Sequence, residues 1–150
     1  MLRIAVRYQS RGGNTRKVAE AIARKSGVVA KPLDPSEKFS PAVDLLFVGG
    51  GFYAGKPHKM VTDALSALTA EQTGGVAFFF TSMDPDAKMA QKLRAAVKDP
   101  TIAVMDDAFR CDGKFLFFRR DRPDANDLAK AESFAKRTLE ARRKALEALK

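Results

Sequence analysis

The sequence predicts an α/β protein, a three-layer sandwich in which five parallel strands form one sheet of order 2-1-3-4-5 between two layers of helices. Short apolar runs typical of buried strands alternate along the chain with segments in which apolar residues recur every three or four positions, as in helices. Strands that alternate with helices form parallel sheets that are covered on both faces. The length of 150 residues fits one domain that spans residues 1–150.

The first half of the chain contains three predicted strands and one helix. Gly27 is expected to end the helix, because glycine is the usual residue just past a helix C-terminus. Pro32 favours an edge position for the second strand, since proline cannot donate to a strand ladder. The third strand is almost continuously apolar, as expected when helices cover both faces of a sheet. The expected elements are strand 2–8, helix 15–25, strand 28–33, a connector at 34–42 and strand 44–48.

The second half continues the alternation and ends in a long amphipathic helix with a basic outer face, on which Lys136, Arg142 and Arg143 are expected. Before it, the apolar run 115–118 is expected either to pair as an edge strand or to pack beneath the last helix. The expected elements are a glycine-rich turn at 49–56, a helix whose first position suits Pro57, strand 75–81, a helix from Asp86, strand 101–105, a loop at 106–123 and helix 124–149.

Composition and charge exclude several classes of protein. Cys111 is the only cysteine, so the chain cannot form an internal disulfide, and one thiol cannot hold an iron–sulfur cluster or a structural zinc ion. We expect no membrane span and no signal peptide, and a cytoplasmic location fits the lone cysteine best. The 27 Lys and Arg against 18 Asp and Glu give a formal net charge of +9, which is only weak evidence for nucleic-acid binding.

Small and polar residues gather in the turn after the first strand. Gly12 and Gly13 let backbone N–H groups approach a ligand closely, and the following helix N-terminus favours an anion. The hydroxyls of Ser10 and Thr15 can add hydrogen bonds. A second glycine-rich turn follows the third strand, and the two turns flank the topological switch point, where ligands of parallel sheets bind. The turn chemistry alone leaves open an ordinary strand-to-helix turn capped by Asn14.

The segment 8–22 resembles the FMN phosphate-binding signature of the flavodoxin family. The shared pattern is an aromatic residue after the first strand (Tyr8), a hydroxyl two residues later (Ser10), then Gly-Asn-Thr and a helix that contains Val-Ala. The resemblance covers nearly the whole chain and implies a flavodoxin-like sandwich with one FMN bound non-covalently. It implies that the phosphate is held by Ser10, Arg11, Gly12, Gly13, Asn14 and Thr15.

The second turn resembles the family's first flavin-ring loop. Aromatic side chains there can stack on or flank an isoalloxazine ring. The alternative is a glycine-rich turn whose two aromatic residues pack inward. Residues 50–56 also fit the glycine and lysine spacing of a nucleotide P-loop, but Pro57 stands where a Ser or Thr would bind magnesium, and this excludes the P-loop. The implied ring-loop residues are Gly51, Phe52, Tyr53, Ala54 and Gly55.

The third implied flavin contact is the loop after the fourth strand, with Thr81, Ser82 and Met83. In flavodoxins this loop commonly carries an aromatic residue, but here it has none, so Met83 is the expected neighbour of the ring. The sequence also departs from the family at Gly12, where many members have Thr, and at Arg7, where an apolar residue is usual.

Other residues give weaker signals. His58 is predicted to be a solvated residue at the start of a helix, with proton donation to a substrate as the alternative. Cys111 is predicted to be a small buried hydrophobe, and the basic face of the last helix to be solvated rather than a docking surface. We assign no catalytic side chain and no metal ligand. The phosphoacceptor chemistry of receiver domains is excluded, because Gln9-Ser10 and Gly49-Gly50 replace the acidic residues that it needs.

The resemblance predicts an FMN-binding redox protein, either an electron carrier or an FMN-dependent oxidoreductase with NAD(P)H or quinone-type partners. Electron-transfer flavodoxins are typically acidic, whereas this chain places Arg11, Arg16, Lys56 and His58 near the expected site. Positive charge stabilises an anionic reduced flavin, so the reduction potential should be less negative, and a protein partner should be acidic. The alternative is a flavin-free module of the same fold whose basic surface binds an acidic protein or nucleic acid, with nucleic acid the less favoured.

Overall fold

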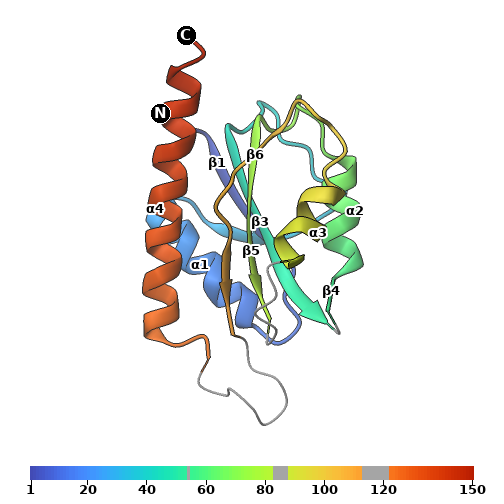
Figure 1. The fold of residues 1–150 in the computed structure, drawn as a ribbon, viewed down its shortest axis with the longest axis vertical. Helices are drawn as coiled ribbons and strands as arrows, with labels where there is room; N and C mark the ends of the chain where they lie inside the picture. Colours follow the sequence, from blue (N-terminus) through green and yellow to red (C-terminus); the bar gives the residue numbers. More distant parts are fainter. Residues whose placement is uncertain (54, 83–87, 113–121) are drawn as a thin grey trace.

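A parallel sheet runs through the centre of the molecule (Figure 1). The computed structural model describes residues 1–53, 55–82, 88–112 and 122–150. The strand order is β2-β1-β3-β5-β6 with every neighbouring pair parallel, which confirms the predicted 2-1-3-4-5 sheet. The strands are β1 (Ile4–Tyr8), β2 (Ala30–Pro32), β3 (Leu45–Tyr53), β5 (Gly75–Thr81) and β6 (Ala103–Val104).

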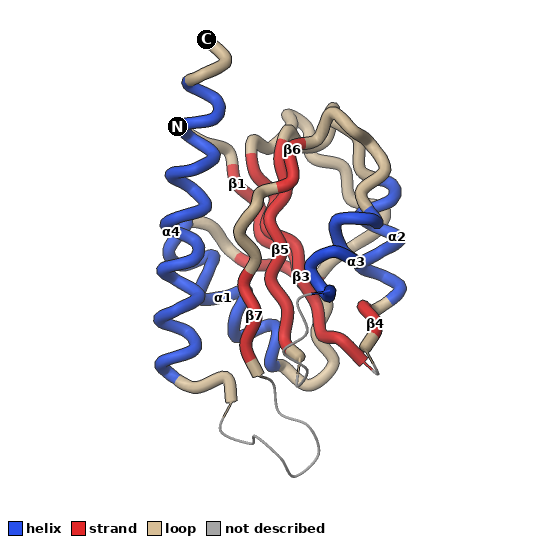
Figure 2. Tube along the Cα trace, in the orientation of Figure 1, coloured by secondary structure: helices blue, strands red, loops and turns tan. Residues whose placement is uncertain are grey.

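Two helices cover each face of the sheet, so the predicted three-layer sandwich is confirmed (Figures 1 and 2). Helices α1 and α4 pack on one face, where the rings of Phe47 and Phe134 meet edge to face with centroids 5.9 Å apart. Helices α2 and α3 cover the other face through Val61, Leu65 and Leu93. Burying a side chain of this size stabilises the fold by about 1.5–3 kcal/mol. The helices are α1 (Asn14–Ser26), α2 (Lys59–Ala67), α3 (Lys88–Ala96) and α4 (Ala125–Glu147).

Helix ends follow the capping residues of the sequence. Gly27 ends α1 in the left-handed conformation, with φ at +74°, as predicted. At the start of α4, the carboxylate of Asp124 accepts from the Asp127 N–H, and the carboxylate of Asp127 accepts from the Asp124 N–H. This reciprocal pair fixes where α4 begins. Among the described residues, no helix has the length and apolarity needed to cross a membrane.

The unusual arginine in the first strand is compensated by the connector between β2 and β3. Arg7 is buried, and its Nε and Nη2 atoms donate to the two carboxylate oxygens of Glu37 at 2.7 and 2.8 Å. Its guanidinium also lies 5.2 Å from the centroid of the Phe39 ring. The Arg7 hydrogen bonds lower the pKa of Glu37 below its ordinary value. The connector therefore covers part of the sheet without forming a helix.

The second glycine-rich segment differs from the prediction. Residues 49–53 were expected to be a turn, but they extend β3, which then pairs antiparallel with a short strand β4 (Lys56–Pro57). A Cβ atom on Gly49 would lie 2.0 Å from the Phe79 carbonyl oxygen, so glycine is required for packing inside the sheet. The predicted helix start at Pro57 is also wrong, because Pro57 belongs to β4 and α2 begins at Lys59.

The last strand position is occupied by two short strands rather than one. β6 pairs with the beginning of β5, and a further strand β7 (Phe109–Cys111) pairs in parallel with the end of β5 (Figure 2). Asp106 and Asp107 interrupt the apolar pattern between the two strands, while Phe109 and Cys111 are buried again. The prediction of a loop throughout 106–123 is therefore wrong at β7. The expectation for the apolar run 115–118 falls outside the described residues.

One residue of the predicted basic outer face faces inward. Arg142 is buried, and its Nε atom donates to the carbonyl oxygen of Asp44 at 2.9 Å. Its guanidinium lies against Gly74 and Gly75, where a Cβ atom would approach it to within 2.7 and 2.9 Å. Burial lowers the pKa of Arg142 below its ordinary value. One of the basic residues that the sequence assigns to the outer face of α4 therefore belongs to the core.

Candidate functional site

The turn after β1 leads directly into α1, at the end of the sheet opposite the two chain termini (Figure 1). The Ser10 hydroxyl oxygen accepts from the backbone N–H groups of Gly13 and Arg16, at 3.1 and 3.3 Å. Gly13 is the N-cap, with φ at +91°, and not Asn14, which was the cap in the alternative that the turn chemistry left open. The first turn of α1 contains no Asp or Glu, and its N-terminus favours an anion.

The outer side of this turn is open. A Cβ atom added to Gly12 or to Gly13 would have no described atom within 4 Å. Arg11 and Arg16, on either side of these glycines, are exposed. The turn therefore combines a helix N-terminus, two cations and free space, which together suit a phosphate group.

Thr15 joins this turn to the end of β5. Its Oγ1 atom lies 2.8 Å from the Thr81 Oγ1 atom, and both side chains are buried. The next residue, Ser82, is also buried, and its carbonyl oxygen accepts from the Arg110 guanidinium at 2.8 Å. The structure thus brings together the predicted residues of the first and third loops.

The end of β3 lies against the first turn through Gln9. The Gln9 side chain accepts from the Gly51 N–H at 3.3 Å and donates to the Tyr53 hydroxyl at 3.4 Å. The Arg11 guanidinium lies over the Tyr53 ring, 4.1 Å from its centroid. A Cβ atom on Gly51 would lie 2.8 Å from the Tyr53 hydroxyl, so glycine makes room for this tyrosine.

The neighbouring aromatic residues Phe52 and Tyr53 contact different parts of the molecule. Phe52 packs on Phe80, with ring centroids 5.1 Å apart, and belongs to the core beneath α2 and α3. Tyr53, in contrast, contacts the first turn through Gln9 and Arg11. Gly55 has φ at +77°, and its carbonyl oxygen accepts from Lys92 of α3 at 2.6 Å. The predicted site residues Ala54 and Met83 fall outside the described residues.

Two further residues singled out by the sequence have defined surroundings. His58 caps α2, with its Nδ1 atom accepting from the Met60 N–H at 3.1 Å, and its ring lies edge-on to Tyr53 with centroids 6.1 Å apart. Cys111 is buried in the core, and this burial raises the pKa of its thiol to about 12. A thiol with that pKa is inert at neutral pH, which agrees with the predicted role as a small buried hydrophobe.

Comparison with known proteins identifies the architecture. No protein-family model matches the sequence. An uncharacterized protein of Methanocaldococcus jannaschii is 28% identical over 141 residues, which cover 84% of this chain and 90% of that protein. A WrbA-like flavodoxin from Agrobacterium tumefaciens superposes with a TM-score of 0.71 at 17% identity, covering 96% of this chain and 99% of that one. Oxidised flavodoxin 2 from Bacillus cereus gives a TM-score of 0.70 at 16% identity, with coverage of 93% and 99%. The chain has a flavodoxin-like fold.

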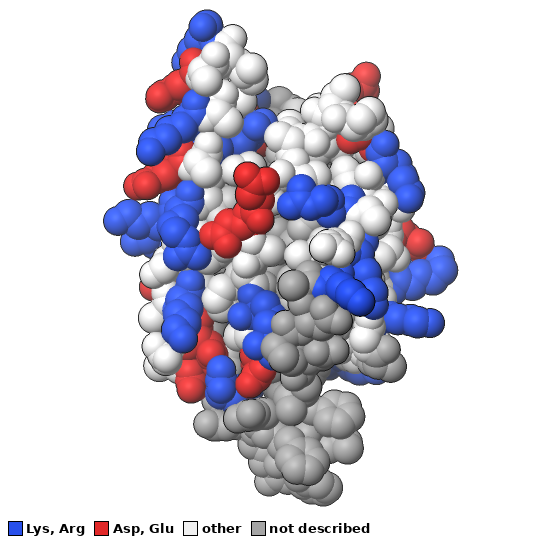
Figure 3. Space-filling model, viewed as in Figure 1, with Lys and Arg blue, Asp and Glu red and all other residues white. Residues whose placement is uncertain are grey.

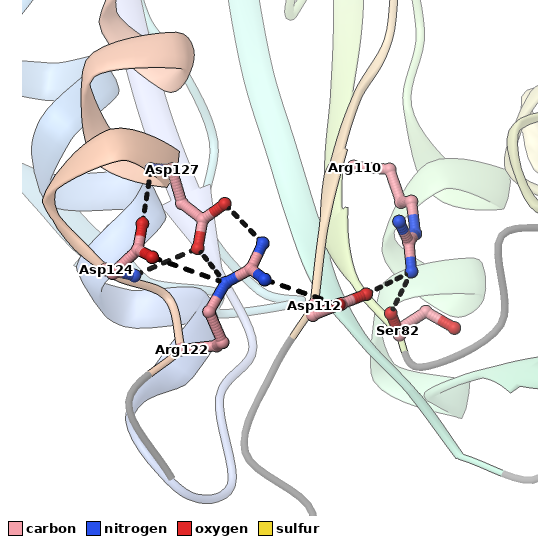
Figure 4. Close-up of polar contacts among 6 residues, drawn as sticks. All are labelled: Ser82, Arg110, Asp112, Arg122, Asp124 and Asp127. Carbon is pink, nitrogen blue, oxygen red and sulfur yellow. Dashed lines mark hydrogen bonds and ion pairs between the residues drawn. The ribbon is translucent and has the colours of Figure 1, made fainter. Parts of the chain in front are cut away.

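In this flavodoxin-like fold, sequence reasoning missed an ionic network beside the third loop (Figure 4). Arg110 of β7 pairs with Asp112, and Arg122 connects Asp112 at 3.6 Å to Asp127. The Arg122 guanidinium binds both carboxylate oxygens of Asp127, at 2.5 and 2.7 Å, which lowers the pKa of Asp127. The network ties the start of α4 to β7 and, through Arg110, to the third loop. Its residues all lie between positions 110 and 127, a stretch that was largely expected to be a loop, so their pairing was not predicted.

Gln9 was also missed as a site residue, although it directly follows the first strand of the flavodoxin-like sheet. On the view drawn in Figure 3, Lys and Arg side chains line the outer sides of the molecule, along α4 on one side and over the α2 and α3 region on the other. Near the first and second turns, the exposed cations include Arg11, Arg16, Lys17, Lys56, Lys59 and Lys92.

Proposed function

We propose that this protein binds one FMN non-covalently and acts in redox chemistry. The observation that carries the proposal is the meeting of the first turn, the end of β3 and the third loop at one edge of the sheet. Thr15 contacts Thr81, and Gln9 contacts Gly51 and Tyr53. This is the topological switch point, where ligands of such sheets bind. FMN supplies the electron or hydride transfer when bound, while the chain positions it and sets its electrostatic surroundings.

The first turn fits the phosphate of FMN. The α1 N-terminus, the open face beside Gly12 and Gly13, and the exposed Arg11 form a donor set without a nearby carboxylate in the first helical turn. A dianionic phosphate gains charge-assisted hydrogen bonds in such a site. The proposed phosphate-binding residues are Ser10, Arg11, Gly12, Gly13, Asn14 and Thr15.

The flavin ring is assigned to the space bordered by residues 51–55 and the third loop. Tyr53 is the aromatic residue of this pair that points toward the first turn, since Phe52 packs in the core. Arg110 holds the Ser82 carbonyl and so fixes the beginning of the third loop. Backbone groups positioned in this way can bond the edge of the ring.

The redox role follows from charge. The chain carries a formal net charge of +9, and Arg11, Lys56 and Lys92 lie near the proposed ring and phosphate sites. Positive charge favours a reduced anionic flavin. We therefore place an FMN-dependent oxidoreductase acting on NAD(P)H or quinones ahead of an electron carrier that docks on an acidic protein, in the cytoplasm.

The test is a visible absorption spectrum of the purified protein, followed by titration of FMN with protein while flavin fluorescence is recorded. We expect saturable one-to-one quenching. Gly13→Ala should weaken FMN binding at least tenfold. Alanine is strained at the Gly13 φ of +91°, and its methyl group would occupy the open face of the phosphate turn. Gly27→Ala is the matched control: it places a side chain at a φ of +74°, with no described atom within 4 Å, at the other end of α1.

The second candidate is a flavin-free module with the same fold, which the lack of an aromatic residue at 81–85 favours. Absence of FMN binding at micromolar concentrations would support it over the redox function. Binding to an acidic protein or nucleic acid would then weaken steeply with salt.

A further inference from the structure

Both backbone polar groups of Ser82 are bound by β7. The Ser82 N–H donates to the Cys111 carbonyl oxygen at 3.1 Å, and the Ser82 carbonyl oxygen accepts from the Arg110 guanidinium at 2.8 Å. The preceding residue, Thr81, lies opposite Cys111 in the sheet, and its hydroxyl contacts that of Thr15. The attachment of Ser82 to β7 therefore fixes where the third loop begins relative to the first turn.

Arg110 has a donor that the described residues do not satisfy. Its Nε atom is buried and has no hydrogen-bond partner among the described residues. A buried donor without a partner costs free energy of folding, so stability alone does not account for an arginine at this position. The guanidinium is oriented through its Nη2 atom, which donates to both the Ser82 carbonyl and the Asp112 carboxylate (Figure 4). This arrangement favours a role for Arg110 in positioning the third loop.

Asp112 connects Arg110 to a second arginine. Its Oδ1 atom accepts from Arg110, and its Oδ2 atom lies 3.6 Å from the Nη1 atom of Arg122. Arg122 is fixed in turn by Asp127 of α4, whose side chain is only 5% exposed. Loss of one member of such a network weakens the hydrogen bonds of the next, because buried charged groups depend on one another. The contacts shown in Figure 4 therefore link α4 to Ser82 across β7.

We propose that Arg110, Asp112 and Arg122 are positioning residues for the proposed flavin site. They act as one unit that holds Ser82 against β7, and FMN affinity depends on this unit. None of the three belongs to the residues assigned to the phosphate or to the ring, and Arg122 acts through Asp112 and Arg110. The effect on FMN rests on the proposed function, whereas the positioning of Ser82 does not.

The first experiment measures FMN affinity by flavin fluorescence in Arg110→Gln, Asp112→Asn and the double variant. Each single substitution should weaken FMN binding about tenfold, the loss expected for one charge-assisted hydrogen bond. The double variant should bind no more weakly than Arg110→Gln, because Asp112 acts through Arg110. Arg110→Lys keeps the positive charge and a donor for the Ser82 carbonyl, so it should retain most of the affinity.

Two further variants test the far end of the network and the charge change. Arg122→Lys keeps a cation for Asp127 but removes the planar fork that also reaches Asp112, and should weaken FMN binding about threefold. Arg137→Gln is the matched control for Arg110→Gln, because it removes the same charge from an ion pair with Asp107 at 3.1 Å. The Arg137 side chain is 61% exposed on α4 outside the network, so FMN affinity should not change.

Cys111 gives a second readout that does not depend on flavin. It is the only cysteine and is buried in β7 between Arg110 and Asp112, so its alkylation reports opening of the end of this strand. N-ethylmaleimide is uncharged, and its approach is therefore insensitive to the charge changes. In the flavin-free protein, alkylation should be about tenfold faster in Arg110→Gln and in Asp112→Asn, and unchanged in Arg137→Gln. Urea unfolding of each variant separates this local opening from a loss of overall stability.

The outcomes decide the proposal. Weaker FMN binding in both single variants, no further loss in the double variant and faster alkylation support it. Additive losses in the double variant, or unchanged FMN affinity in variants that remain folded, would overturn it. Losses of affinity that only follow the fraction of unfolded protein would also overturn it, because the network would then be purely structural. If the unsubstituted protein does not bind FMN, the proposed function fails, and alkylation alone decides: faster rates support the positioning of Ser82, and equal rates overturn it.

Discussion

The two glycine-rich segments of this protein use the same residue for opposite reasons. In the first turn, a Cβ atom on Gly12 or Gly13 would meet no described atom within 4 Å. In β3, a Cβ atom on Gly49 would meet the Phe79 carbonyl oxygen at 2.0 Å, and one on Gly51 would meet the Tyr53 hydroxyl at 2.8 Å. Glycine leaves open space in the first segment, where we propose that the FMN phosphate binds, whereas in the second it lets protein atoms pack together.

This difference changes how such segments should be interpreted. A run of glycines after a buried strand predicts a ligand loop only where the space beside it stays open. In β3, backbone and side chains of the protein itself fill that space, and the strand continues through Tyr53. Substitutions at the two segments should therefore separate stability from ligand binding.

Gly49→Ala should have the largest effect on stability. Its Cβ would overlap a backbone oxygen of the neighbouring central strand, which cannot move away as a side-chain end can. We expect a loss of about 3 kcal/mol in the free energy of unfolding, or failure to fold. Urea unfolding followed by circular dichroism measures this, with Gly12→Ala as control at about 0.5 kcal/mol or less. Equal losses for the two variants would contradict the distinction between packed and open glycines.

Glu37→Gln tests the packing beneath the first turn. Arg7 lies in β1 just before that turn, and the substitution leaves its buried guanidinium without a carboxylate. We expect a loss of about 2 kcal/mol at pH 7 with little change in FMN affinity. The folded-state pKa of Glu37 is lowered, so the contribution is complete above its ordinary value of 4.5 and is lost as the pH falls through the lowered pKa. The difference from the unsubstituted protein should therefore shrink at pH 3, and a difference independent of pH would exclude this explanation.

Gly51→Ala should have an intermediate effect. The added Cβ meets the Tyr53 hydroxyl, which is the end of a side chain that can move. We expect a loss of about 1 kcal/mol in stability, the lower end for an overpacked site. The displaced tyrosine would also lose its contacts with Gln9 and Arg11, so FMN affinity should fall. Paired unfolding and flavin-fluorescence titrations measure the two effects, and a stability loss as large as that of Gly49→Ala would show that Tyr53 cannot move.

The sequence predicts most of the fold because its strands and helices are set by local patterns. Strand 75–81 has the predicted bounds, and helix α1 differs from its prediction by one residue at each end. The division of the last strand into β6 and β7 was missed because the apolar pattern of the four residues between them is too weak to show that a second strand follows. The extension of β3 was missed because glycine favours turns in general and strands only where a neighbour packs closely.

The contacts of the site depend on residues distant in sequence. Thr15 and Thr81 are 66 positions apart, and Arg7 and Glu37 are 30 positions apart, so local patterns do not pair these side chains even when the strand order is predicted. The orientation of Phe52 and Tyr53 depends on where β3 ends, and the extent of that strand was underestimated. Arg142 shows the same limit, since the amphipathic pattern of α4 does not reveal that one of its basic residues binds the Asp44 carbonyl.

The smallest expected effect concerns Lys92, which reaches the turn between β3 and β4. Its ammonium donates to the Gly55 carbonyl at 2.6 Å from an exposed position on α3. Lys92→Gln removes a positive charge near the proposed ring site, so the reduction potential of bound FMN should become more negative by a small amount that declines with added salt. Lys98→Gln removes the same charge beyond the end of α3, where Lys98 bonds the Ala95 carbonyl, and is the control. A potentiometric titration in which both variants shift the potential equally would assign the effect to net charge rather than to this contact.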